Sequence, residues 1–99
     1  AGSFTTSSDP KLKKDMTILP SALDMIDEIN GYSYTWKDEI RGVGLQYGVN
    51  ADEIEALNPA IVKMGDDGYK SVNYNALVGV LLGAIKELKA EVAELKTKV

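Results

Sequence analysis

A repeat of apolar residues, at alternating spacings of three and four, runs to the end of the chain and constrains its fold more than any other feature. The repeat comprises Val78, Leu81, Ile85, Leu88, Val92, Leu95 and Val99. This spacing is typical of an α-helix whose narrow apolar seam packs against neighbouring helices in a coiled coil. A helix of about 24 residues is roughly 36 Å long. We therefore expect it to hold an oligomer only together with other contacts.

The seam has two candidate partners, namely its own domain or the same helix of other chains. Amphipathic helices usually cover their own domain. Beyond Lys86, however, the only apolar residues outside the seam are Ala90 and Ala93, and such a narrow apolar face suits a coiled coil. If the seam occupies heptad positions a and d, Glu91 faces Lys96 of a parallel neighbour. We therefore expect a parallel homo-oligomer around this helix.

The number of chains in that oligomer is open at this point. β-branched residues at a with leucine at d favour two helices in model coiled coils. Further apolar residues near the start of the helix widen its apolar face and suit a third neighbour; these are Leu77, Leu82 and Ala84.

Composition limits the class of protein. Ninety-nine residues with 44% hydrophobic side chains suffice for one domain with a modest core. The net charge of −4 argues against nucleic-acid binding, and the absence of cysteine excludes a disulfide framework and the usual zinc sites. The longest apolar stretch, 76–85, is too short to cross a bilayer, and the polar amino-terminal residues do not resemble a signal peptide. We expect a soluble domain without a metal, cofactor, nucleic-acid partner or membrane partner.

Local patterns before the seam predict one helix and one hairpin. Ser21 and Asp24 have the spacing of a capping box for a helix over 22–29, whose inward face would contain residues 22, 26 and 29. Asn30–Gly31 would end that helix. Alternating aromatic and polar residues then predict a strand over 32–37, and a similar alternation predicts a second strand over 43–49.

The next segments predict a short helix, a turn and a strand. Asn50 and Glu53 form a second capping pattern, and Asn58–Pro59 would end this helix. Its inward face would be Ile54 and Leu57. A turn at 66–68 precedes a short strand within 69–74, and Asn75 would cap the final helix. The expected fold class is α+β and mainly helical, with a small antiparallel hairpin beside the long helix.

Three patterns that sometimes mark ligand sites have simpler explanations here. Tyr34 and Trp36 can stack on a sugar or a base, but aromatic residues that alternate along a strand more often belong to a core. Gly79 and Gly83 permit close approach of another helix. The glycines at 42, 44 and 48 are not followed by a lysine–serine or lysine–threonine pair, so they do not form a phosphate loop.

One pair of residues can carry nucleophilic chemistry. The chain has no histidine, so an acyl transfer would need another base, and Lys13 stands five residues after Ser8. Such a lysine must act as a neutral amine, whereas a free lysine has a pKa of about 10.4. Desolvation or the charges of Lys11 and Lys14 would favour the neutral form. On these residues alone, however, Ser8 belongs to a polar leader and Lys13 to a solvated cluster. Asp9, which precedes a proline, is typical of a turn cap and less typical of a group that orients the dyad.

The order of several motifs resembles the C-terminal intramolecular chaperone domain of bacteriophage endosialidases, tailspikes and tail fibres. The motifs are Ser8-Asp9-x-x-Leu12-Lys13-Lys14-Asp15, Ala22-Leu23-Asp24, the aromatic segment 32–37, the run Tyr47-Gly48-Val49-Asn50-Ala51-Asp52-Glu53-Ile54-Glu55, Asn58-Pro59, Val72-Asn73-Tyr74 and Ala84-Ile85-Lys86-Glu87-Leu88. The resemblance covers residues 8–99. Each motif alone is weak, but their order and distances are specific.

This resemblance implies a homotrimer that folds the fibre stalk preceding it and then cuts itself off. Ser8 would be the nucleophile, Lys13 the base, and Ser7–Ser8 the scissile bond. Residues 1–7 would be the end of the upstream stalk or a leader, and residues 8–99 the chaperone domain. The implied location is a virion tail precursor assembled in the host cytoplasm, from which the domain is released after cleavage.

Two alternatives of other classes stay open. A structural cap would trimerise and remain attached, with Ser8 and Lys13 present but not catalytic. An unrelated oligomerisation module is the other, because the family's architecture also occurs in a membrane-bound eukaryotic transcription factor.

Overall fold

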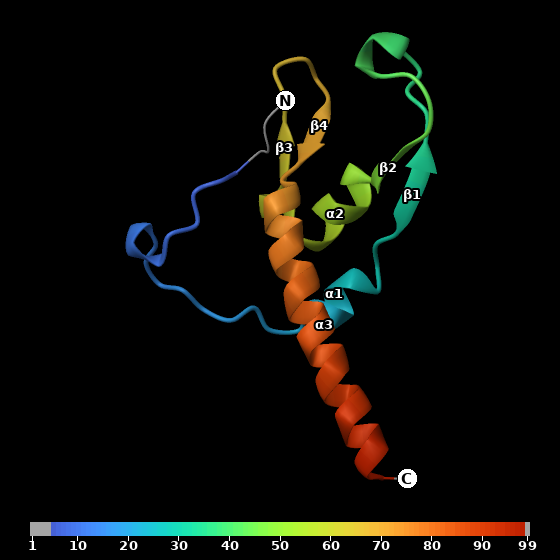
Figure 1. Cartoon of the computed structure of the whole chain (residues 1–99). Coiled ribbons are helices and arrows are strands. Elements are labelled where there is room, and N and C mark those ends of the chain that lie inside the picture. The colour runs from blue at the N-terminus through green and yellow to red at the C-terminus, as the bar shows by residue number, and fades with distance from the viewer. Residues whose placement is uncertain (1–4, 99) are drawn as a thin grey trace.

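A computed structural model describes residues 5–98, so Val99 and residues 1–4 lie outside the described part of the chain. The fold contains one long helix, α3 (Tyr74–Thr97), and two short helices, α1 (Ala22–Ile26) and α2 (Ala51–Leu57). Two small antiparallel sheets of two strands each accompany them. Figure 1 shows α3 as a rod whose C-terminal part extends beyond the other elements. The expected α+β fold with a long C-terminal helix is confirmed, with two small hairpins where one was expected.

The predicted hairpin is present, but its strands are shorter than expected. Strand β1 (Gly31–Tyr34) pairs with β2 (Gln46–Val49), with Gly31 opposite Val49 and Tyr34 opposite Gln46. The 3₁₀ turn η2 (Glu39–Arg41) lies between them, and the Asp38 carboxylate accepts the Ile40 N–H at 3.0 Å. Gly42 and Gly44 follow with backbone φ angles of 145° and 91°, which residues other than glycine rarely adopt. These glycines interrupt the second strand, so the prediction that it begins at residue 43 is wrong, and Val43 and Leu45 are exposed.

A second hairpin consists of β3 (Val62–Met64) and β4 (Lys70–Val72), with Val62 opposite Val72. The predicted turn between them is confirmed by a bond from the Gly68 N–H to the Gly65 carbonyl at 3.1 Å. The expected strand after the turn is also present, whereas β3 was not predicted. Its three residues are too few to show an alternating pattern in the sequence.

Helix α2 begins as predicted, because the Asn50 side chain accepts the Asp52 N–H at 2.8 Å. The 3₁₀ turn η3 (Pro59–Ile61) follows it. The capping box predicted for α1 is wrong: Ser21 has a φ of 55° and its side chain forms no capping hydrogen bond. The predicted cap of α3 is also wrong by two positions, since Asn73 rather than Asn75 accepts the Ala76 N–H.

The core is small and lies where α3 meets the rest of the domain. Its buried residues are Ala22, Ile54, Ile61, Leu77, Val80 and Ala84. On α2, the expected inward position Ile54 is buried, while Leu57 is half-buried. Tyr34 and Trp36 were expected in a core, but they stack edge to face at 5.1 Å outside it, with the Arg41 guanidinium 5.8 Å from the Trp36 ring centre. The side chain of Trp36 therefore packs locally and is not buried.

Candidate functional site

The residues before α1 form an exposed arm rather than part of the core. From Thr5 to Ser21, every residue is exposed, and the only regular element is the 3₁₀ turn η1 (Pro10–Leu12). In Figure 1 the arm lies farthest from α3 at η1 and returns to it at α1. It carries exposed apolar side chains that the single chain does not cover, namely Leu12, Met16, Ile18 and Leu19.

The turn η1 brings Ser8 and Lys13 together. The Lys13 Nζ donates to the Ser8 Oγ across 2.8 Å. Pro10 provides a φ already suited to the turn, and the Lys13 N–H closes it on the Pro10 carbonyl at 3.1 Å. Because the chain reverses direction at this turn, the side chain of Lys13 lies beside that of Ser8. The candidate nucleophile and base therefore meet within one local turn.

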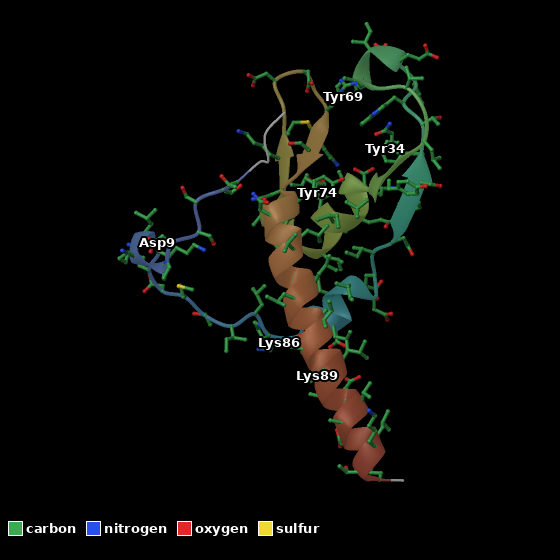
Figure 2. The ribbon with its side chains drawn as sticks, viewed as in Figure 1. Asp9, Tyr34, Tyr69, Tyr74, Lys86 and Lys89 are labelled. Carbon is green, nitrogen blue, oxygen red and sulfur yellow. The ribbon has the colours of Figure 1, made fainter. Side chains whose placement is uncertain are left out.

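Asp9 caps this turn, as its sequence context predicted. Its Oδ1 accepts the Lys11 N–H at 2.9 Å, and its Oδ2 lies 3.9 Å from the Lys11 Nζ. Figure 2 shows Asp9 at the outer bend of the arm. The carboxylate thus acts on the shape of the turn, while a role in orienting the dyad stays a prediction.

The dyad opens onto the amino-terminal end of α3. An open recess there is lined by Thr6, Ser7, Ser8 and Lys13 of the arm and by Asn73, Asn75, Ala76 and Val78 of the helix start. The Asn75 Nδ2 donates to the Thr6 Oγ1 at 3.2 Å, which ties the arm to the helix. Sequence reasoning assigned Asn75 only to helix capping. No local pattern could reveal its partner, because the two residues are separated by 69 positions.

The six described seam residues do not pack on their own domain. Between 40% and 63% of each side chain is exposed, in Val78, Leu81, Ile85, Leu88, Val92 and Leu95. The helix buries a different face, formed by Leu77, Val80 and Ala84. The alternative that the seam covers its own domain is therefore wrong for these positions, and Val99 lies outside the described residues. Val78 belongs both to the seam and to the recess beside the dyad.

Close approach of α1 to α3 depends on one of the two glycines noted in the sequence. A Cβ added at Gly83 would lie 3.1 Å from the Ala22 Cβ, whereas one added at Gly79 would meet nothing within 4 Å. The expectation of a close helix contact is thus confirmed for Gly83. At Gly79 the described chain leaves open space.

Side-chain contacts attach both hairpins to α2. The Lys70 Nζ of β4 lies 2.7 Å from Asp52 Oδ1 and 2.8 Å from Glu55 Oε1. Hydrogen bonds to Asp52 and then Glu55 raise the pKa of Lys70 above its ordinary value. The Tyr32 hydroxyl donates to Glu53, and this bond raises the pKa of Tyr32. These groups lie on hairpins and α2, not on the arm that carries the dyad.

Among residues 5–98, no cluster of three or more histidine, cysteine, aspartate or glutamate side chains is arranged to hold a metal ion. Within the same range, no helix has the length and apolar content needed to cross a membrane.

Comparisons with known proteins agree with the resemblance noted in the sequence. Residues 8–63, more than half of the chain, match a peptidase family model described as "chaperone of endosialidase". The chain is 34% identical over 101 aligned residues to the long tail fiber protein Gp37 of Salmonella phage S16, an alignment that covers 94% of this chain. It is 35% identical over 87 residues to the Gp37 protein of Escherichia phage AR1, which covers 81% of this chain.

The chain spans a small part of these relatives. The alignments cover 14% of the Salmonella phage protein and 8% of the Escherichia phage protein. The family match covers both residues of the dyad, the first hairpin and α2. This chain therefore belongs to the chaperone-of-endosialidase family.

Proposed function

We propose that this chain is the chaperone segment of a phage tail fibre, which trimerises, helps the preceding stalk to fold and then detaches by cutting the Ser7–Ser8 bond. The observation that carries the proposal is the 2.8 Å contact between the Lys13 Nζ and the Ser8 Oγ. The family match begins at residue 8, which is consistent with a domain boundary directly before Ser8. Residues 1–7 would then belong to the released stalk and residues 8–99 to the chaperone.

The proposed reaction is an acyl shift followed by hydrolysis. A neutral Lys13 amine takes the Ser8 hydroxyl proton while the Ser8 Oγ attacks the carbonyl carbon of Ser7. The C–N bond between Ser7 and Ser8 breaks, and Lys13 passes the proton to the departing Ser8 amine. Water then hydrolyses the Ser7 ester, leaving a Ser7 carboxylate and the Ser8 hydroxyl. Nucleophile and substrate share one chain, so each chain cuts once.

Assembly offers a physical reason for the timing of this cut. Exclusion of water from a lysine favours its neutral form, which can act as a base. In the single chain the dyad is exposed, and its recess is open beside Val78. A parallel neighbour packed on the seam would cover Val78 and narrow the recess. Cleavage would then follow assembly instead of preceding it.

Three chains are proposed because α3 has apolar surface beside the seam as well as on it. Leu82 is 61% exposed next to the six exposed seam positions, whereas Leu77 and Ala84, which were also expected to face a third neighbour, are buried in the chain's own core. A wider apolar face can contact two neighbouring helices, as a trimer requires. The upstream fibre stalk would be the folding client, and the long tail fibre relatives support a location in a virion tail assembled in the host cytoplasm.

Intact mass of freshly produced protein tests the cleavage. The chain would carry a longer upstream segment and be compared with Ser8→Ala and Lys13→Ala variants. We expect the wild-type chain to be cut before Ser8 and both variants to stay intact. Ser7→Ala is the matched control, since it changes the adjacent serine without removing the dyad, and we expect it to be cut.

The outcomes separate the alternatives. Equal cutting in all variants would contradict the assignment of Ser8 and Lys13. An intact wild-type trimer would instead favour the structural cap that stays attached. Light scattering on the same samples measures whether three chains associate.

A further inference from the structure

The arm and the long helix meet at one polar contact that the proposed dyad does not explain. Asn75 lies on the first turn of α3, and its Nδ2 donates to the Thr6 Oγ1 at 3.2 Å. Asn75 is not needed to cap the helix, because the Asn73 side chain already accepts the Ala76 N–H at 3.0 Å. Its carboxamide is therefore available to the arm.

The contact fixes the chain upstream of the scissile Ser7–Ser8 bond, whereas the turn η1 that joins the dyad lies downstream of that bond. Downstream of that bond, η1 and the bond from Lys13 fix Ser8. Upstream of that bond, Thr6 directly precedes Ser7, and the Thr6 side chain is hydrogen-bonded to Asn75. The Ser7 carbonyl thus lies between two anchored residues. Reactions of this kind depend strongly on the orientation of the attacked carbonyl.

We infer that Asn75 is a positioning residue for self-cleavage, which docks Thr6 on α3 and so orients the Ser7 carbonyl toward the Ser8 Oγ. The inference rests on the proposed function. It links self-cleavage to α3, because the chain upstream of the scissile bond is positioned only when the start of α3 is folded. Val78, one turn further along the same helix, is the first residue of the seam.

The test measures the first-order rate of cutting in full chains that carry an upstream segment. We expect Asn75→Ala and Thr6→Val to slow the cut by roughly three- to tenfold each, as the loss of one neutral hydrogen bond predicts. The double variant should be no slower than either single variant, since both remove the same contact. Thr6→Ser keeps the hydroxyl and should restore a rate near that of the wild type.

Two controls test whether the effect is specific to Thr6 and whether it acts before the ester forms. Thr5→Val makes the same change at an adjacent threonine whose side chain has no hydrogen bond within residues 5–98, and it should cut at the wild-type rate. Hydroxylamine cleaves esters but not ordinary amides, so it reports which step is slow. In Asn75→Ala it should leave the rate low, because the defect precedes ester formation.

Any other result would overturn either the role of Asn75 or the proposed function on which it rests. A wild-type rate in Asn75→Ala and Thr6→Val, with Lys13→Ala uncut, would overturn the role of Asn75 while leaving the dyad in place. Full recovery of Asn75→Ala with hydroxylamine would also overturn it, because the ester would then form normally. A wild-type chain that never cuts would instead overturn the proposed function.

Discussion

The Glu87 carboxylate accepts the backbone N–H of Ala22 at 2.7 Å, and it thereby caps α1 from a helix that is 65 residues away in the sequence. The same Oε2 accepts the Leu23 N–H at 3.2 Å. Ser21, the expected cap, has a left-handed backbone and does not reach these groups with its side chain. A carboxylate at a helix start is favourable because the first N–H groups of a helix lack partners within it. Glu87 therefore attaches the end of the arm to α3.

Removing this carboxylate should destabilise the domain. Ala22 is only 1% exposed, so Glu87→Ala leaves a donor without a partner inside the fold. We expect a loss of about 1–3 kcal/mol in the free energy of unfolding. Glu87→Gln keeps an acceptor oxygen and should lose less. Urea unfolding followed by circular dichroism, at equal protein concentrations, measures the difference. Glu28→Ala, at an exposed carboxylate, is the control; an equal loss there would contradict the capping role of Glu87.

The two glycines of α3 should respond differently to alanine. Gly79→Ala adds a methyl group in open space and should stabilise the helix by about 1 kcal/mol. Gly83→Ala puts its methyl group 3.1 Å from the Ala22 Cβ, and strain between α1 and α3 should offset that gain. Thermal unfolding of both variants checks this order. Equal stabilisation by the two changes would show that α1 can move aside without cost.

A charge on the seam should prevent association without unfolding the single chain. Ile85 is 63% exposed, so Ile85→Lys adds a charge that one chain leaves in water but an assembly would bury. Burial of an unpaired charge costs several kcal/mol, which weakens association by roughly a hundredfold or more. Light scattering should give the mass of one chain. Ala93→Lys, at an exposed position outside the seam, should still associate; an assembled Ile85→Lys would contradict the proposed interface.

The attachment of β4 to α2 should weaken in alkaline solution. The folded chain raises the pKa of Lys70 above the ordinary 10.5, so the folded state binds this proton more tightly than the unfolded state. The resulting stabilisation is complete below that ordinary value and is lost as the pH rises through the raised folded value. We expect the stability difference between wild type and Lys70→Gln to shrink above about pH 10.5. Because Lys70 lies at the surface, the effect should be modest.

Urea midpoints measured from pH 8 upward check this dependence. Lys37→Gln is the matched control, since Lys37 forms no ion pair within the described residues. A difference for Lys70→Gln that grows with pH would have the wrong sign. Tyr32→Phe should behave in the same direction as Lys70→Gln, because the hydrogen bond to Glu53 raises the pKa of Tyr32 as well.

Features that depend on neighbouring residues were predictable from the sequence. The caps at Asp9 and Asn50, the turn at 66–68 and the long final helix all follow from side chains acting within a few positions. The pairing of Ser8 with Lys13 is also of this kind, because the turn that joins them is encoded by Asp9 and Pro10. The heptad spacing likewise determined which face of α3 stays apolar.

Contacts between distant segments were decided only by the tertiary structure. No local pattern shows that Glu87 replaces Ser21 as the cap of α1, or that Asn75 reaches Thr6 instead of capping its own helix. The division of α3 into a buried face at Leu77, Val80 and Ala84 and an exposed seam also depends on where α1 and α2 lie. Spacing along a helix specifies which side chains share a face, but packing determines which face the domain covers.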